Sequence, residues 1–222
     1  MTAEILEEPW RLFRIMGEFV EGFSGLSRLG AAVTMFGSAR TKPSNRFYRL
    51  ADRLSYRLVD ELGYSIITGG GPGIMEAANR GAKRAGGKSV GLCIDLPMEQ
   101  SSNRFVTHPI TFRFFFCRKV CFIKYASAIV IFPGGYGTMD EFLELITLVQ
   151  TRKIKQVPIL LVGRAYWGGL IRWMKDVVLK RERNIDAADL DLFTLTDSIE
   201  EAFDVIRRSQ IHYSILEHPE SR

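Results

Sequence analysis

Short apolar runs alternate with amphipathic stretches along most of this sequence, and this alternation constrains the fold more than any other feature. Buried strands are predicted over residues 32–36, 64–68, 89–94, 128–132, 157–162 and 191–195. Helices are predicted over residues 45–62, 72–84, 112–124, 138–150, 168–180 and 197–208. Strands that are continuously apolar and separated by helices form a parallel sheet covered on both faces. We therefore predict an α/β fold, a Rossmann-like doubly wound parallel sheet with helices on both faces.

The 222 residues suffice for one such domain with a sizeable core, whereas two full domains would be cramped. We divide the chain into an N-terminal helical extension (1–30), a single Rossmann-like nucleotide-binding domain (31–210) and a C-terminal tail (211–222). The extension holds an apolar helix predicted over residues 10–23, which Gly22 and Gly25 would end. Its apolar surface must pack on the domain or on a second subunit. Together with the apolar stretch over residues 112–124, it exceeds what one small sheet needs to cover, so we expect at least a dimer with Arg118 near the interface.

Several weaker signals place the ends of individual elements. Pro72 suits the first turn of its helix, where a missing N–H has little effect. Asp197 and Glu200 fit a capping box that opens the last helix. A short extra strand is expected over residues 104–108, just before the strongly apolar stretch that we assign to a helix.

Composition and charge restrict the cellular location of the chain and the classes of ligand it is expected to bind. No stretch approaches the roughly 20 apolar residues that span a bilayer. The first nine residues carry three glutamates and no basic residue, the reverse of a secretory signal, so we expect a cytoplasmic protein. A formal charge of +5 favours anionic ligands without naming one. A short basic run at Arg152, Lys153 and Lys155 leaves nucleic acid as a weak alternative, because such runs are usually solvated faces.

The three cysteines, Cys93, Cys117 and Cys121, are too few and too odd in number for a disulfide framework. A zinc site needs about four convergent ligands, and the three histidines are widely scattered. We therefore expect buried, reduced thiols and no metal.

Two glycine-rich loops each follow a predicted strand and open a predicted helix. The first is Gly69-Gly70-Gly71-Pro72-Gly73, and the second is Pro133-Gly134-Gly135-Tyr136-Gly137-Thr138. Glycine lets the backbone approach a phosphate closely, and the helix N-terminus behind it adds roughly half a positive charge. Either loop alone could be only a tight turn. Two such loops at the carboxyl ends of strands favour a site for a phosphorylated ligand.

Neither of the two common nucleotide motifs is present. The dinucleotide fingerprint counted from Gly71 reaches Glu76 where a third glycine or alanine belongs, and no Gly-Lys-Ser/Thr follows either loop. The sequence therefore indicates a phosphate without indicating NAD or ATP, and we expect no cofactor.

Two acidic and two basic side chains are candidates for chemistry. Glu141 follows Thr138 by three residues, which fits either a capping box or a carboxylate turned toward the sugar of a bound nucleotide. Asp140 is the competing acid. Arg118 and Lys119 lie in an apolar helix, where a cation needs an anionic partner or a route to water, and the pattern does not choose between them.

These segments resemble the LONELY GUY (LOG) family. The resemblance rests on GGGPGIME at 69–76, on Arg118-Lys119, and on PGGYGTMDE at 133–141, which matches the family motif PGGxGTxxE. It extends over residues 32–208 and is similar to the longer bacterial-type members of the family. It implies a Rossmann-like dimer that hydrolyses a cytokinin riboside 5′-monophosphate or AMP to the free base and ribose 5-phosphate.

The resemblance also assigns roles to residues. It implies Arg118 and Glu141 as the catalytic pair, without a cofactor or a metal. The implied nucleotide-binding residues are Gly37, Ser38, Gly70, Gly71, Gly73, Met75, Glu76, Arg118, Lys119, Gly134, Gly135, Tyr136, Gly137 and Thr138. An older label for the family is lysine decarboxylase, but no pyridoxal-phosphate lysine context is evident. The alternative is a nucleotide or molybdenum-cofactor carrier on the same fold, which binds without hydrolysing. The sequence does not choose between plain and N6-modified adenine.

Overall fold

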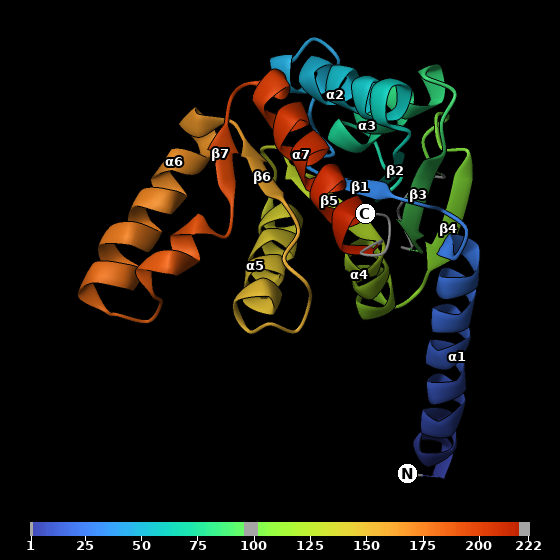
Figure 1. Cartoon of the computed structure of the whole chain (residues 1–222). Coiled ribbons are helices and arrows are strands. Elements are labelled where there is room, and N and C mark those ends of the chain that lie inside the picture. Colours follow the sequence, from blue (N-terminus) through green and yellow to red (C-terminus); the bar gives the residue numbers. More distant parts are fainter. Residues whose placement is uncertain (1, 96–101, 218–222) are drawn as a thin grey trace.

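The computed structural model describes residues 2–95 and 102–217 of the chain. A parallel sheet of seven strands in the order β4-β3-β2-β1-β5-β6-β7 forms its centre (Figure 1). The strands are β1 (Ala32–Phe36), β2 (Ser65–Thr68), β3 (Ser89–Ile94), β4 (His108–Phe112), β5 (Ala126–Ile131), β6 (Ile159–Val162) and β7 (Thr194–Thr196). The chain builds outward from β1 through β4 on one side and then returns to pair β5 with β1. The predicted doubly wound sheet is confirmed, and its switch point lies between β1 and β5.

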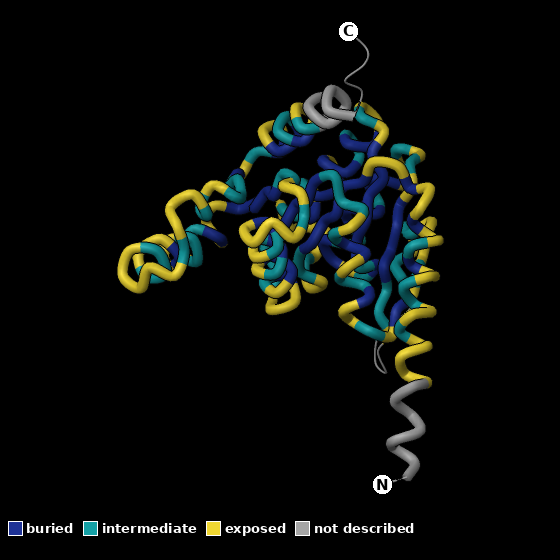
Figure 2. The backbone as a smooth tube through the Cα atoms, turned by 60° about the horizontal axis from the view of Figure 1, so that its bottom comes forward, coloured by how far each residue is buried: buried dark blue, intermediate teal, exposed yellow. Residues whose placement is uncertain are grey.

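Helices cover both faces of the sheet. They are α1 (Thr2–Leu26), α2 (Arg46–Leu62), α3 (Ile74–Arg84), α4 (Phe115–Lys124), α5 (Tyr136–Gln150), α6 (Arg164–Trp173) and α7 (Ile199–Glu217). One apolar cluster packs α2, α3 and α7 on one face, and a second packs α1, α4, α5 and α6 on the other. Alternate residues of β1 belong to the two clusters, with Val33 in the first and Ala32 in the second, as the strand period requires. Figure 2 shows the buried strands between these two layers.

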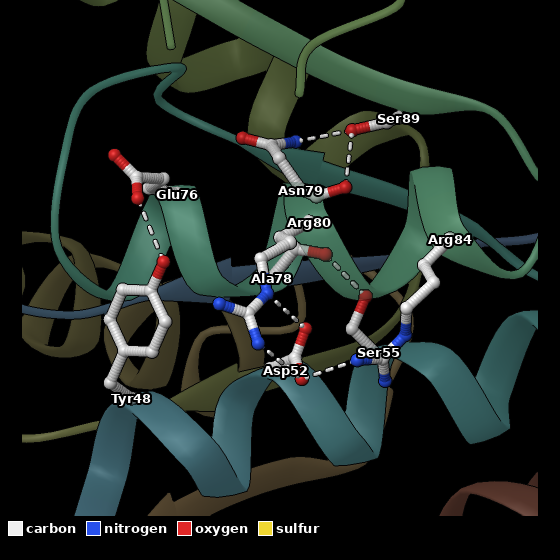
Figure 3. A network of polar contacts seen from close by, with 9 residues as sticks. All are labelled: Tyr48, Asp52, Ser55, Glu76, Ala78, Asn79, Arg80, Arg84 and Ser89. Atoms are coloured by element: carbon white, nitrogen blue, oxygen red, sulfur yellow. Dashed lines mark hydrogen bonds and ion pairs between the residues drawn. The ribbon is translucent and has the colours of Figure 1, made fainter. Parts of the chain in front are cut away.

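Charged and polar contacts reinforce the layer that α2 and α3 form (Figure 3). The buried Asp52 carboxylate accepts a hydrogen bond from Arg80 Nε at 3.2 Å and pairs with Arg84 Nη1 at 3.2 Å. The Ser55 hydroxyl donates to the Ala78 carbonyl. The two helices approach so closely that a Cβ on Gly81 would meet the Asp52 carbonyl oxygen at 2.2 Å. This layer gives α3 a fixed position behind the first glycine loop.

The N-terminal helix is longer than its sequence suggests. It continues through Gly22 and Gly25 to Leu26, so the prediction that these glycines end it is wrong. A Cβ on Gly22 would lie 2.9 Å from Cys121 Sγ, and one on Gly25 would lie 2.8 Å from Ile110 Cδ1. The glycines therefore allow α1 to pack closely on α4 and β4.

Two predicted boundaries near the edge of the sheet are also wrong. The extra strand is His108–Phe112 rather than 104–108, and α4 begins only at Phe115. Residues before His108 form a turn, in which the Val106 N–H donates to the Asn103 carbonyl. Phe112 is 1% exposed and belongs to the strand, so the apolar run that suggested one long helix spans two elements.

Several helix and strand ends differ from their predicted positions. Gly73 is the residue before α3, so Pro72 lies outside that helix. The last strand is Thr194–Thr196, later than predicted. Ser198 rather than Asp197 caps α7, because its Oγ accepts the Glu201 N–H, whereas Asp197 accepts the Arg164 N–H at the start of α6. The helix predicted over 168–180 starts earlier, and a π-helix (Met174–Arg181) follows α6.

The C-terminal helix α7 reaches Glu217, within the predicted tail, and the rest of that tail lies outside the described residues. Within the described part of the chain, no helix has the length and apolar character needed to cross a membrane. The same residues hold no group of three or more His, Cys, Asp or Glu side chains arranged for a metal ion.

Candidate functional site

A pocket of about 980 Å³ opens at the carboxyl ends of the central strands. The loop after β1 forms one wall, α4 forms another, and the second glycine loop with the first turns of α5 forms a third. Its volume lies at the upper end of the range for small-molecule sites. The described lining residues are Phe36, Gly37, Ser38, Ala39, Arg40, Thr41, Asn45, Phe47, Gly69, Met75, Phe115, Arg118, Phe122, Pro133, Gly134, Gly135, Tyr136, Gly137, Thr138, Met139, Asp140, Glu141 and Tyr166.

The second glycine loop presents the N-terminus of α5 to this pocket. The N-cap of α5 is Gly135, and no side chain caps the helix. Gly135 and Gly137 both line the pocket, and a Cβ on either would meet nothing within 4 Å. Their glycine identity is therefore not required by packing within the chain. The space beside this uncapped helix end suits an anion that approaches the backbone closely.

Gly134 differs from its two neighbours in the same loop. A Cβ there would lie 2.0 Å from the Thr138 hydroxyl oxygen, so this glycine is required by the fold of the loop. The Tyr166 hydroxyl on α6 donates a hydrogen bond to the Gly134 carbonyl. Thr138 is 8% exposed and lies in the first turn of α5, where its side chain faces the loop.

The loop after β1 connects the two glycine loops. The Ser38 N–H donates to the Pro133 carbonyl at 3.0 Å, and the Ser38 carbonyl accepts the Ile74 N–H at 3.1 Å. Gly37 and Ser38 therefore lie at the pocket and also fix the relative position of β1, α3 and the second glycine loop. Sequence reasoning placed these two residues in the site, and the structure brings them there.

The first glycine loop has mainly a packing role. The Asn103 amide donates to the carbonyls of Gly70 and Gly71 at 3.0 and 2.9 Å. Gly73 has φ of +70°, and a Cβ there would meet the Ser38 carbonyl oxygen at 2.3 Å. The structure does not bring Gly70, Gly71 or Gly73 into the described pocket lining, whereas it does place Gly69 there.

Met75 and Glu76, which follow this loop, point in different directions. Met75 lines the pocket, and its sulfur lies 2.9 Å from the Cβ position of Gly69. Glu76 does not appear in the described lining, because its carboxylate accepts a 2.8 Å hydrogen bond from the Tyr48 hydroxyl on α2 (Figure 3). Burial and this carboxylate raise the pKa of Tyr48 to about 12.

Glu141 is the buried acid of the pocket. It is 8% exposed, and its Oε2 atom accepts no hydrogen bond from any described residue. Burial raises the pKa of the Glu141 carboxyl to about 7, against the opposing effect of the Lys119 and Arg118 charges. The capping-box alternative is wrong, because α5 already begins at Tyr136 and the Thr138 N–H donates to the Gly135 carbonyl. The carboxylate is thus available to a ligand in the pocket.

The two cations of α4 occupy different surroundings. The Arg118 guanidinium lines the pocket and lies over the rings of Phe115 and Phe122, at 5.6 and 5.1 Å from their centroids. Lys119 is not in the described lining, and its ammonium pairs with Asp140 at 2.9 Å and Glu144 at 2.8 Å. The structure therefore places Arg118 at the pocket and Lys119 in ion pairs with two acids of α5.

Several residues of the pocket were not predicted from the sequence. Asn45 is recognisable only as the N-cap of α2, where its side chain accepts the Phe47 N–H. Arg40, in the loop after β1, and Tyr166, on α6, also line the pocket. No motif marks these positions, because they reach the pocket only through the packing of elements that are distant in sequence.

Comparisons with known proteins show the family of the chain and relatives of its fold. A family model described as "Possible lysine decarboxylase" matches residues 75–206, more than half of the chain. The probable cytokinin riboside 5′-monophosphate phosphoribohydrolase LOG4 of Oryza sativa subsp. japonica is 38% identical over 82 residues, which are 36% of this chain. That match spans only 34% of the rice protein's length.

Solved structures share the fold. The molybdenum cofactor binding protein of Rippkaea orientalis superposes with a TM-score of 0.58 at 20% identity, covering 80% of this chain and 94% of that protein. The molybdenum cofactor carrier protein of Chlamydomonas reinhardtii gives a TM-score of 0.58 at 21% identity, covering 82% and 97%. At such identities the likeness concerns the fold alone. The family match and the PGGYGTMDE segment around Glu141 carry the assignment, and the chain belongs to the LOG family, whose model bears the lysine decarboxylase description.

Proposed function

We propose that this protein hydrolyses the N-glycosidic bond of a nucleoside 5′-monophosphate, releasing the free base and ribose 5-phosphate. One observation carries the proposal. The buried Glu141 carboxylate, with an oxygen that no described residue hydrogen-bonds, lines the same pocket as the uncapped N-terminus of α5. An anion site and an acid that is not held by its own main chain are the two parts that this reaction needs.

In this proposal the phosphate binds at the start of α5. Its oxygens accept backbone N–H groups beside Gly135 and Gly137, where the absence of side chains leaves space, and the Thr138 hydroxyl adds a donor. Binding the phosphate, which is remote from the reacting bond, orients the sugar within the pocket. The helix dipole contributes to the same site.

Bond breaking develops positive charge at the anomeric carbon of the ribose. The Glu141 carboxylate stabilises this charge and orients a water molecule toward the anomeric carbon. The oxygen of that water forms the new bond to the carbon. The electron pair of the broken bond leaves with the base, and one water proton ends on that base. The Arg118 guanidinium, which lines the pocket and acts on the charge of Glu141, holds the carboxylate and the sugar in place.

We propose the base of the substrate from the name of the rice relative together with the size and lining of the pocket. The rice protein is named for a cytokinin riboside 5′-monophosphate, an N6-substituted adenine nucleotide. A pocket of about 980 Å³ with Phe47, Phe115 and Tyr166 in its wall has room and apolar surface for such a substituent. We propose AMP and its N6-substituted forms as the substrate class.

Lysine decarboxylation has no support in this site. A pyridoxal-phosphate enzyme binds its cofactor through a lysine Schiff base. No lysine is among the described residues that line the pocket, and Lys119 is held in ion pairs with Asp140 and Glu144.

The decisive experiment is incubation of the full chain with AMP or isopentenyladenosine monophosphate, followed by chromatography for the free base. We expect equal amounts of base and ribose 5-phosphate. Tight nucleotide binding without base release would instead support the alternative of a non-catalytic carrier on this fold.

We also propose that the enzyme is a homodimer, because large apolar side chains are exposed on α4, which lines the pocket, and on α1. On α4, Phe115 and Phe116 are 54% and 46% exposed, and on α1, Trp10 and Phe13 are 67% and 62% exposed. Light scattering at micromolar concentration should give twice the 25.2 kDa mass of the chain. A mass equal to that of a single chain would contradict this proposal.

A further inference from the structure

The N-terminus of α4 is capped by a side chain from another helix. The N-cap residue Phe114 has no side-chain cap of its own. Instead, Glu18 of α1 accepts the Arg113 N–H on Oε1 at 2.9 Å and the Phe114 N–H on Oε2 at 3.1 Å. A carboxylate at this position satisfies N–H groups that lack partners within α4 and complements the positive end of its dipole.

This cap lies next to the backbone of Arg118. The Arg118 N–H donates to the Phe114 carbonyl at 3.4 Å, so Arg118 closes the first turn of α4. The N–H of Phe114 thus donates to Glu18, and the carbonyl of the same residue accepts the N–H of Arg118. This first-turn hydrogen bond is long, and helix ends fray when their caps are lost. The orientation of the Arg118 side chain in the pocket therefore depends on this turn.

The part of α1 that follows Glu18 packs closely on α4 and so holds Glu18 in place. A Cβ on Gly22 would lie only 2.9 Å from Cys121 Sγ, so the two helices are in close contact one turn after Glu18. At the other end of α4, the Tyr125 hydroxyl donates to the Phe23 carbonyl at 3.2 Å. Helix α1 thus contacts α4 at its N-terminus, its middle and its C-terminal end.

We infer that Glu18 is a positioning residue, which acts through the first turn of α4 to hold Arg118 at the pocket. The inference rests on the proposed function and gives the N-terminal helix a part in catalysis. Glu18 itself does not appear in the described lining of the pocket, so it does not contact the substrate.

The test compares Glu18→Ala with Glu21→Ala in the full-length protein. Glu21 lies on the same helix and is exposed, so its loss removes an acid from α1 without removing the cap. We expect Glu18→Ala to lower kcat for AMP about tenfold, and to change the Kd for AMP less than about threefold, because the α5 phosphate site is untouched. Glu18→Gln keeps one acceptor oxygen and should recover part of the loss. Glu21→Ala should match the wild type.

Two further measurements separate positioning from general destabilisation. Adding Glu18→Ala to Arg118→Ala should lower kcat by less than about a further twofold. The reason is that both substitutions remove the same effect, the action of a correctly placed Arg118 side chain. Amide hydrogen exchange of residues 113–118 should become about fivefold faster in Glu18→Ala, while exchange in β1 and β5 stays unchanged. Losses that multiply in the double variant, or wild-type kcat in Glu18→Ala, would overturn this inference alone. A wild-type protein that releases no base would overturn the proposed function, and this inference with it.

Discussion

Replacing Glu141 with glutamine is expected to lower base release from AMP by about 10³-fold while nucleotide binding persists. Glutamine keeps the size of the side chain but cannot carry the negative charge that stabilises the developing cation. In the proposed function the phosphate binds at the N-terminus of α5 and not at this carboxyl, so the Kd for AMP should change little. Single-turnover chromatography of the released base and calorimetric titration with AMP measure the two quantities separately.

Glu144→Gln is the matched control for this variant. Glu144 lies one turn further along α5 and also faces Lys119, at 2.8 Å, but it is not among the described pocket-lining residues. Glu144→Gln should retain activity within a few-fold of the wild type. Wild-type turnover in Glu141→Gln, or an equal loss in Glu144→Gln, would refute the assigned role of Glu141.

The same carboxyl should set the pH dependence of the reaction. Burial raises the pKa of Glu141 from 4.5 to about 7, so the carboxylate form increases as the pH rises through 7. If the ionised form is the active one, kcat/KM should increase up to about pH 7 and then level off. The Glu144 carboxylate contributes to the raised pKa of Glu141, so the profile of Glu144→Gln should move to lower pH. A rate that falls with rising pH would instead identify Glu141 as a proton donor.

The raised pKa also predicts a stability difference. A group whose pKa is higher in the folded than in the unfolded state favours folding fully below pH 4.5, and this contribution is lost as the pH rises to about 7. Glutamine does not titrate, so the stability of Glu141→Gln does not fall in this pH range for that reason. Its stability relative to the wild type should therefore increase by roughly 3 kcal/mol between pH 4 and pH 8, as measured by urea unfolding. A constant difference across this range would mean that Glu141 titrates normally.

The sequence predicts the sheet well because its central strands are buried on both faces. Residues of β1, β2 and β6 are buried without exception, and such runs have few alternatives. The edge strand β4 is mostly exposed, carries a weaker pattern and was placed four residues too early. Arg113 alone separates its last residue, Phe112, from the apolar stretch that leads into α4, and sequence alone does not show where the strand ends.

The candidate site is less predictable because a glycine can be required by the backbone conformation or can leave space for a ligand. Glycine at 73 is required by a positive φ and by the carbonyl of Ser38, whereas glycine at 137 leaves open space in the pocket. Both positions have the same appearance in the sequence. The same holds for Arg118 and Lys119, whose neighbours along the helix are similarly apolar. Only the packing of α4 against α5 places one cation at the pocket and the other in ion pairs with Asp140 and Glu144.

Gly137→Ala is expected to weaken nucleotide binding at least about tenfold without weakening the fold. The added methyl group would meet no atom of the protein within 4 Å, but it would project into the space that the phosphate occupies in this proposal. Alanine also has a higher helix propensity than glycine, so the free energy of unfolding should stay the same or rise by up to about 1 kcal/mol. Calorimetry should thus show a weaker affinity for AMP, while urea unfolding shows no loss of stability.

Two other glycines provide the comparison that this prediction needs. Gly169, in α6, also has nothing within 4 Å of its Cβ position, but it is not among the described lining residues, so Gly169→Ala should keep AMP affinity while gaining similar stability. Gly134→Ala should lose both properties, because its methyl group would lie 2.0 Å from the Thr138 hydroxyl oxygen. If Gly137→Ala and Gly169→Ala bound AMP equally well, the phosphate would not lie against the first turn of α5. The glycines of that turn would then need an explanation other than a ligand.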